Sequence, residues 1–321
     1  MTHVKYPPVF IPTLSRYEHL HRCVESLRNC THADKTELII GLDYPPSEKY
    51  REGYEKIKSY IPQIEGFLKV TLIEHTSNLG GLNNWYYLED YCRKHYDCYI
   101  GSEDDNEFSP CFLDYMSKAL SHYKDDPNVS SVSGYSDACC QDQGGHHTYF
   151  CYANSAWGLG MWSDKEDYLK PLIEDNSFLQ EKFRKRSLAL SFFKKFPGRF
   201  GSLIGMLRRG ENWGDVKRST INYIEKKYQL RPALSLCRNW GYDGSGEHCS
   251  VVNSYSTQEI SSSKVFEYEF EPADAESKSC RYLYKNSGLP KNMLKRIYYK
   301  LIYVYSYVRF LKELNNVNND K

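Results

Sequence analysis

Short apolar runs alternate with segments of helical spacing through the first 135 residues of this 321-residue chain. The runs expected to form strands are residues 9–11, 37–42, 68–74, 98–102 and 129–134. Between the first two, Leu20, Val24 and Leu27 recur at the spacing of one helix face. This alternation predicts an α/β fold, with a mainly parallel central sheet and helices on both faces.

The pattern changes after residue 134. Residues 135–160 are irregular and rich in Gly, Ser, Cys, His and aromatic side chains. Residues 219–228 are expected to be helical, 231–237 to form another strand, and 289–314 to form a basic, Tyr-rich helix. Because ligands of parallel sheets bind beyond the carboxyl ends of the strands, the residues that follow each strand are the first candidates for a site.

Composition narrows the function classes. The 42 Lys and Arg nearly balance the 41 Asp and Glu, which argues against a dedicated nucleic-acid binder. No apolar run approaches the ~18 residues of a membrane span, and the first residues lack the apolar core of a signal peptide. We therefore expect a cytoplasmic protein. Its 11 cysteines include no CxxC pair, which favours reduced thiols over a disulfide framework.

Three consecutive acids, Glu103, Asp104 and Asp105, directly follow the expected strand at 98–102. Carboxylates packed this closely repel one another, so their charge needs compensation. Mg²⁺ or Mn²⁺ provides it well, with one or two protein carboxylates plus phosphate oxygens and water as ligands. The alternative is a solvated acidic turn that begins the next helix.

The stretch SEDDNEFSPCFLDYM resembles the acidic signature of GT-A glycosyltransferases, especially its E-D-D form. PVFIPTLSRYEHLHRCVESLRN, ELIIGLDYPP and HTSNLGGLNNW are similar, in order, to successive segments of family 2 glycosyltransferases of the bacterial polysaccharide-assembly type. These similarities cover residues 8–120. The resemblance implies a GT-A fold with a catalytic domain over 1–255 and a helical C-terminal extension over 256–321. The nucleotide-binding half would span about 1–105 and the acceptor half 106–255.

The resemblance also implies roles on the donor side. Asp105 would bind the metal, with His248 from NWGYDGSGEHC as a further ligand, and Glu103 and Asp104 would contact the donor sugar and ribose. Asp43 would bind the nucleotide base. The remaining residues implied near the nucleotide are Thr13, Arg16, Asn78 and Gly80. Arg16 could equally be a surface helix charge, Asn78 and Gly80 a plain turn, and His248 a loop histidine.

On the acceptor side, the segment AWGLGMW resembles the family's acceptor region, with Trp157 and Gly158. ENWGD resembles the segment that carries the catalytic base, for which Asp215 is the candidate and Glu211 the rival, with Trp213 beside the acceptor. Asp215 could instead be the N-cap of the following helix. Tryptophans are also often simply buried in a core.

Two further groups of residues carry weaker signals. Cys139, Cys140, His146, His147 and Cys151 match no standard zinc spacing, so we expect a loop over the acceptor site there. The stretches 182–209 and 289–312 are basic with interleaved apolar residues. Each could cover the core with a solvated face, or lie on an anionic membrane surface, for instance at the inner face of the membrane.

The function implied is a metal-dependent, inverting glycosyltransferase. It would move a sugar from a nucleotide-diphosphate donor, a UDP-sugar by family expectation, to a glycan hydroxyl, lipid-linked or not, in cell-surface polysaccharide assembly. One alternative is a catalytically inactive relative that binds nucleotide or glycan. The other is a sugar-phosphate nucleotidyltransferase, although IPTLSRYEH lacks the glycine-rich loop of those enzymes.

Overall fold

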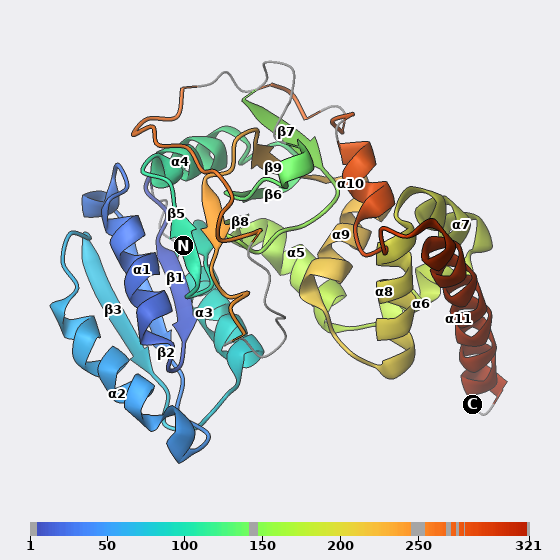
Figure 1. The fold of residues 1–321 in the computed structure, drawn as a ribbon, viewed down its shortest axis with the longest axis horizontal. Helices are drawn as coiled ribbons and strands as arrows, with labels where there is room; N and C mark the ends of the chain where they lie inside the picture. The colour runs from blue at the N-terminus through green and yellow to red at the C-terminus, as the bar shows by residue number, and fades with distance from the viewer. Residues whose placement is uncertain are drawn as a thin grey trace.

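The computed structural model describes residues 5–140, 147–244, 254–267, 271–273, 276–278 and 280–319. An eight-stranded sheet runs through the molecule in the order β3-β2-β1-β4-β8-β6-β9-β7 (Figure 1). Its strands are β1 Val9–Thr13, β2 Glu37–Leu42, β3 Lys69–Glu74, β4 Cys98–Gly101, β6 Val129–Ser133, β7 Thr148–Cys151, β8 Leu159–Trp162 and β9 Tyr228–Pro232. A separate antiparallel pair joins β5 Asn106–Phe108 to β10 Cys237–Asn239.

The sheet is mainly parallel, as predicted. Strands β1 to β4, β6 and β9 share one direction, and β7 and β8 oppose it. The five strands expected before residue 135 all form. The strand expected over 231–237 is wrong in its bounds, because the chain turns between β9 and β10. Strands β7 and β8 occupy part of the stretch expected to be irregular.

Helices cover both faces of the sheet, which confirms the predicted layers (Figure 1). On one face, Val9, Ile11 and Ile40 pack in a core with α1 and α2. On the other face, Phe10 and Ile39 pack against α3. This division arises because successive side chains of a strand point to opposite faces of the sheet. The helices are α1 Tyr17–Arg28, α2 Arg51–Tyr60, α3 Gly81–His95, α4 Phe112–His122, α5 Ser163–Glu174, α6 Ser177–Arg184, α7 Arg186–Lys195, α8 Pro197–Arg209, α9 Gly214–Glu225, α10 Cys280–Asn286 and α11 Met293–Asn319.

The helical C-terminal extension is also confirmed. Helix α11 lies along α8 at the outer edge of the helical layer (Figure 1). The approach is close, since a Cβ on Gly201 of α8 would meet the Tyr303 ring at 2.3 Å. Cys280, Tyr284 and Phe310 belong to the same buried cluster as the sheet residues. Within the described residues, no helix has the length and apolar character needed to cross a membrane.

Candidate active site

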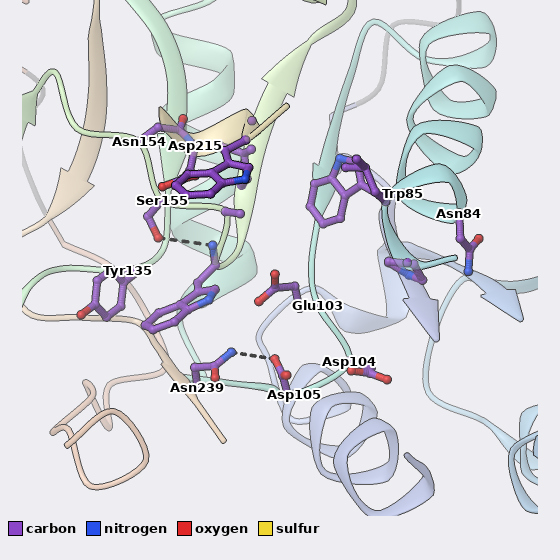
Figure 2. A pocket seen from close by; sticks show the side chains of 18 of the residues that line it. Asn84, Trp85, Glu103, Asp104, Asp105, Tyr135, Asn154, Ser155, Asp215 and Asn239 are labelled. Atoms are coloured by element: carbon purple, nitrogen blue, oxygen red, sulfur yellow. Dashed lines mark hydrogen bonds between the residues drawn. The ribbon is translucent and has the colours of Figure 1, made fainter. Parts of the chain in front are cut away.

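A cleft of about 1560 Å³ opens at the carboxyl ends of β1, β2 and β4 (Figure 2). This is larger than the ~300–1,000 Å³ of a typical small-ligand pocket, so it has room for two substrates. One wall comes from the first half of the chain and the other from residues after 134. The predicted site residues that line the cleft are Thr13, Arg16, Asp43, Asn78, Gly80, Glu103, Asp104, Asp105, Trp157, Glu211, Trp213 and Asp215.

The acidic triplet is held in place by the loop after β1. Thr13 Oγ1 donates a hydrogen bond to Asp104 Oδ2 at 2.9 Å. The Arg16 guanidinium pairs with Asp104 and lies 2.8 Å from Asp105 Oδ2. Arg16 therefore lies in the candidate site and is not simply a surface charge of the helix, which was the alternative.

Asp105 is fixed from its other side by a residue that the sequence reasoning missed. Asn239 Nδ2 donates to Asp105 Oδ1 at 2.6 Å, and the backbone N–H of Trp240 donates to the Asp105 carbonyl oxygen at 2.8 Å. The pairing of β10 with β5 sets Asn239 opposite Asn106. A Cβ on Gly241 would lie 2.1 Å from Asp105 Oδ2, so only glycine allows this approach. In the sequence, the segment NWG at 239–241 was the feature that could have pointed to Asn239.

Glu103 lies in the cleft, with Trp85 on one side and the aromatic wall that contains Tyr135 on the other (Figure 2). Burial, and then the neighbouring carboxylates of Asp105 and Asp104, raise its pKa to about 8, while Arg16 opposes the shift. Burial also raises the pKa of Asp104 despite its pairing with Arg16. One guanidinium thus faces three crowded carboxylates, and the cluster favours additional positive charge.

This donor set fits a hard divalent cation. Carboxylate oxygens are the ligands that Mg²⁺ and Mn²⁺ prefer, and one or two suffice when substrate phosphates and water complete the shell. Among the described residues, no group of three or more His, Cys, Asp or Glu side chains is arranged to hold a metal alone. Phosphate oxygens of a substrate and water would supply further ligands to a cation bound here.

Asp43 holds the loop after β3. Its carboxylate accepts hydrogen bonds from the backbone N–H groups of Tyr44, Leu79 and Gly80 at 2.8–2.9 Å and from Asn78 Nδ2 at 3.1 Å. Gly80 needs its positive φ of 78° at the start of α3. A carboxylate accepts about four hydrogen bonds, so these contacts use the capacity of Asp43. The arrangement favours loop anchoring over the expected contact with a nucleotide base.

Asp43→Asn is expected to lower the free energy of unfolding by about 1–3 kcal/mol, because an amide cannot accept all the N–H groups that meet here. Urea denaturation followed by circular dichroism measures the change. Asp34→Asn, at an exposed position, is the control and should change stability by less than about 0.5 kcal/mol. Equal stability of the two variants would contradict the anchoring role.

The opposite wall of the cleft is aromatic. Trp157 makes edge-on contacts with Tyr135 and Tyr255, at centroid distances of 4.5 and 5.2 Å, and Tyr242 lies 6.2 Å away. Gly158 lies behind this cluster rather than in the cleft. Its φ is 59°, and a Cβ there would meet the Phe112 ring at 2.8 Å, so glycine is required for packing.

Asp215 lies on the cleft wall in the first turn of α9, with its side chain 54% exposed and Arg199 Nη1 3.4 Å from Oδ2. The alternative of Asp215 as the N-cap is wrong, since Trp213 occupies that position. Glu211 is held by two hydrogen bonds from Arg209 at 2.7 and 2.9 Å. Of the two carboxylates, Asp215 is the less constrained.

A buried ionic cluster beneath α9 was not foreseen. Arg218 donates two hydrogen bonds of 2.6 Å to Glu166 on α5 and lies 3.3 Å from Glu89 on α3. Both glutamates are at most 1% exposed. Burial, and then the Glu166 charge, raise the pKa of Glu89 to about 7. The sequence gives no spacing that would link residues from three helices.

The expected metal ligand His248 and the expected loop around Cys139–Cys151 involve residues that the structure describes only in part. His248 and His146 lie outside the described residues. Cys151 ends strand β7, which pairs with β9, so the expectation of a loop is wrong for 148–151.

Comparison with known proteins gives matches among solved structures only. No known protein family matches the chain, and neither does any curated protein sequence. A mannosyltransferase from Pyrobaculum calidifontis, solved with GDP-Man and Mn²⁺, is 13% identical with a TM-score of 0.36. S. aureus TarS is 10% identical with a TM-score of 0.35, and mouse xyloside xylosyltransferase 1 is 9% identical with a TM-score of 0.39.

These similarities are partial. The alignments cover 51%, 52% and 71% of this chain and 46%, 29% and 84% of the respective structures. The chain thus spans less than half the length of the mannosyltransferase and of TarS.

Proposed function

We propose that the chain is a GT-A glycosyltransferase that moves a sugar from a nucleotide-diphosphate donor to a glycan hydroxyl. The observation that carries the proposal is the convergence of Arg16, Asp104 and Asp105 with an aromatic wall in one cleft. Carboxylates that could hold a diphosphate through a divalent cation, with Arg16 beside them, face aromatic rings suited to a saccharide. Trp157 and Tyr135 would stack on the acceptor, because sugars present flat apolar faces to aromatic rings.

The donor would bind over the carboxyl ends of β1 and β4. Asp105 would hold Mn²⁺ or Mg²⁺, with Asn239 and Arg16 fixing the orientation of its carboxylate. The cation would supply charge stabilisation for the departing nucleoside diphosphate. Glu103 would face the donor sugar from its position in the middle of the cleft.

For an inverting transfer, one carboxylate must take the proton of the acceptor hydroxyl as the anomeric carbon is attacked. Asp215 suits this role because it lies on the cleft wall and keeps an exposed carboxylate. Arg199 would orient it. Glu211 suits the role less, since Arg209 holds both of its oxygens.

Calorimetric titration with a panel of nucleoside diphosphates, with and without Mn²⁺, tests the donor site. We expect one base, uridine by resemblance, to bind only with the metal present. The matching nucleotide-sugars should then be hydrolysed slowly to the free diphosphate. Folded protein that binds no diphosphate under any metal condition would contradict the transferase and favour a module that binds glycan alone.

Asp215→Asn is expected to lower kcat by about 10²–10⁴-fold, because it removes the proton acceptor and leaves the donor site intact. Nucleoside diphosphate affinity should stay within about twofold of the wild type if this holds. Steady-state transfer assays and titrations measure the two quantities. Glu211→Gln is the matched variant. A larger loss of kcat in Glu211→Gln than in Asp215→Asn would reassign the base to Glu211.

A further inference from the structure

The outward face of α11 is apolar and uncovered by the described residues. Helix α11 turns Tyr303, Tyr307 and Phe310 toward the core through its contact with α8. Its opposite face carries Leu294, Tyr298, Leu301, Val304, Tyr305 and Val308. Leu294 is 77% exposed, Leu301 65% and Tyr305 64%. These residues recur every three or four positions, so they form one continuous strip along the helix, the α11 outer strip.

Positive charges outnumber negative charges around the α11 outer strip. From residue 277 to 312 the sequence has nine Lys or Arg and no Asp or Glu. Lys291, Lys295 and Lys312 are exposed, and none forms an ion pair with a described carboxylate. Arg309 lies 3.6 Å from Glu313, the acidic residue of the same helix. An exposed apolar strip with lysines beside it suits an anionic membrane surface, because the strip can be buried at the acyl-chain boundary while the lysines meet anionic headgroups.

The other basic stretch, 182–209, does not share this property. The apolar residues of α8, among them Phe200, Leu203 and Ile204, are buried. Four of its nine basic residues form ion pairs with described carboxylates, among them Arg208 with Glu313 and Lys195 with Glu276. The apolar residues of α8 therefore cover the core, whereas those on the outer side of α11 form a continuous exposed strip.

We propose that the α11 outer strip docks the protein on an anionic membrane surface, with the helix lying in the plane of the lipid headgroups. A helix of 27 residues is about 40 Å long and offers a long line of contact. Its exposed tyrosines suit the headgroup region, where such rings concentrate. A second copy of the chain suits the α11 outer strip less well, because its own α11 would place positively charged lysines against the lysines of the first copy.

Sedimentation of the full chain with vesicles tests the proposal. Vesicles of phosphatidylcholine alone are compared with equal mixtures of phosphatidylcholine and phosphatidylglycerol. The wild type should bind the anionic vesicles, with affinity falling as salt rises. Lys291→Gln/Lys295→Gln/Lys312→Gln should weaken binding about a hundredfold, at about fivefold per lysine. Leu294→Ser/Leu301→Ser/Val308→Ser should weaken it at every salt concentration.

The control Lys35→Gln/Lys56→Gln/Lys94→Gln removes three exposed lysines elsewhere and should bind as the wild type does. Circular dichroism checks that each variant is folded. Wild-type protein that stays in solution with anionic vesicles overturns the proposal. Equal binding to neutral vesicles, or equal weakening by the control, also overturns it. A dimer in sedimentation velocity that the serine variant dissociates, without vesicle binding, assigns the strip to a second copy instead.

Discussion

Asp105→Asn is expected to abolish metal-dependent binding of the nucleoside diphosphate, with an affinity loss of about a hundredfold or more. Loss of a residue that merely supports a metal ligand costs about 10–100-fold, and loss of the ligand itself should cost at least as much. The transfer rate should fall about 10³-fold, since the charge on the leaving group loses its stabilisation. Titration with Mn²⁺ and the diphosphate, alongside transfer assays, measures both.

The amide is chosen because it preserves the acceptor for Asn239 and leaves Gly241 undisturbed. Glu107→Gln is the matched control. Glu107 lies two residues further along, but Arg238 and Trp240 hold it outside the cleft at 2.6–2.9 Å. It should bind the diphosphate as the wild type does. Binding that needs no metal and survives Asp105→Asn would keep a nucleotide site but remove the assigned role of the triplet.

Arg218→Ala is expected to cost about 3–5 kcal/mol of unfolding free energy, the largest stability effect anticipated in this chain. The substitution leaves Glu89 and Glu166 buried without their main cation. Urea denaturation at constant pH measures the loss. Arg281→Ala, an exposed arginine on α10, should change stability by less than about 0.5 kcal/mol. Similar costs for the two variants would mean that the cluster contributes little.

The pH dependence gives this prediction a second readout. Because the pKa of Glu89 is about 7 in the fold, above its usual value of about 4.5, the folded state binds its proton more tightly than the unfolded state does. Its stability contribution is full below pH 4.5 and is lost as the pH rises through 7. Removal of Arg218 should enlarge this loss, so the variant should be more impaired at pH 8 than at pH 5. Equal impairment at both would contradict the buried-charge explanation.

Much of the fold could be predicted because local signals and tertiary packing agree. Strand β2 forms at the expected residues, since its apolar run is buried on both faces. Strands β7 and β8 could not be predicted. They are only four residues long, and β8 is held by its neighbours β4 and β6 rather than by any pattern of its own.

Some residues of the candidate site could likewise be predicted from the sequence, and others could not. The acidic triplet was identifiable because three adjacent carboxylates after an apolar strand are chemically conspicuous. Asn239 was not, because it reaches Asp105 only through the pairing of β10 with β5. Asp43 was recognised as special, yet its three hydrogen bonds from the loop after β3 depend on two strands lying side by side.

The sequence by itself determined the layered α/β architecture and the residues with notable chemistry, because hydrophobic periodicity and clustered charge are local properties. Only the tertiary structure decided which of them meet. It brought Arg16 to Asp104, joined Arg218 to two distant glutamates, and distinguished the buried apolar residues of α8 from the exposed α11 outer strip. The physical reason is that contacts, burial and charge compensation arise between segments far apart in the chain, where no spacing rule applies.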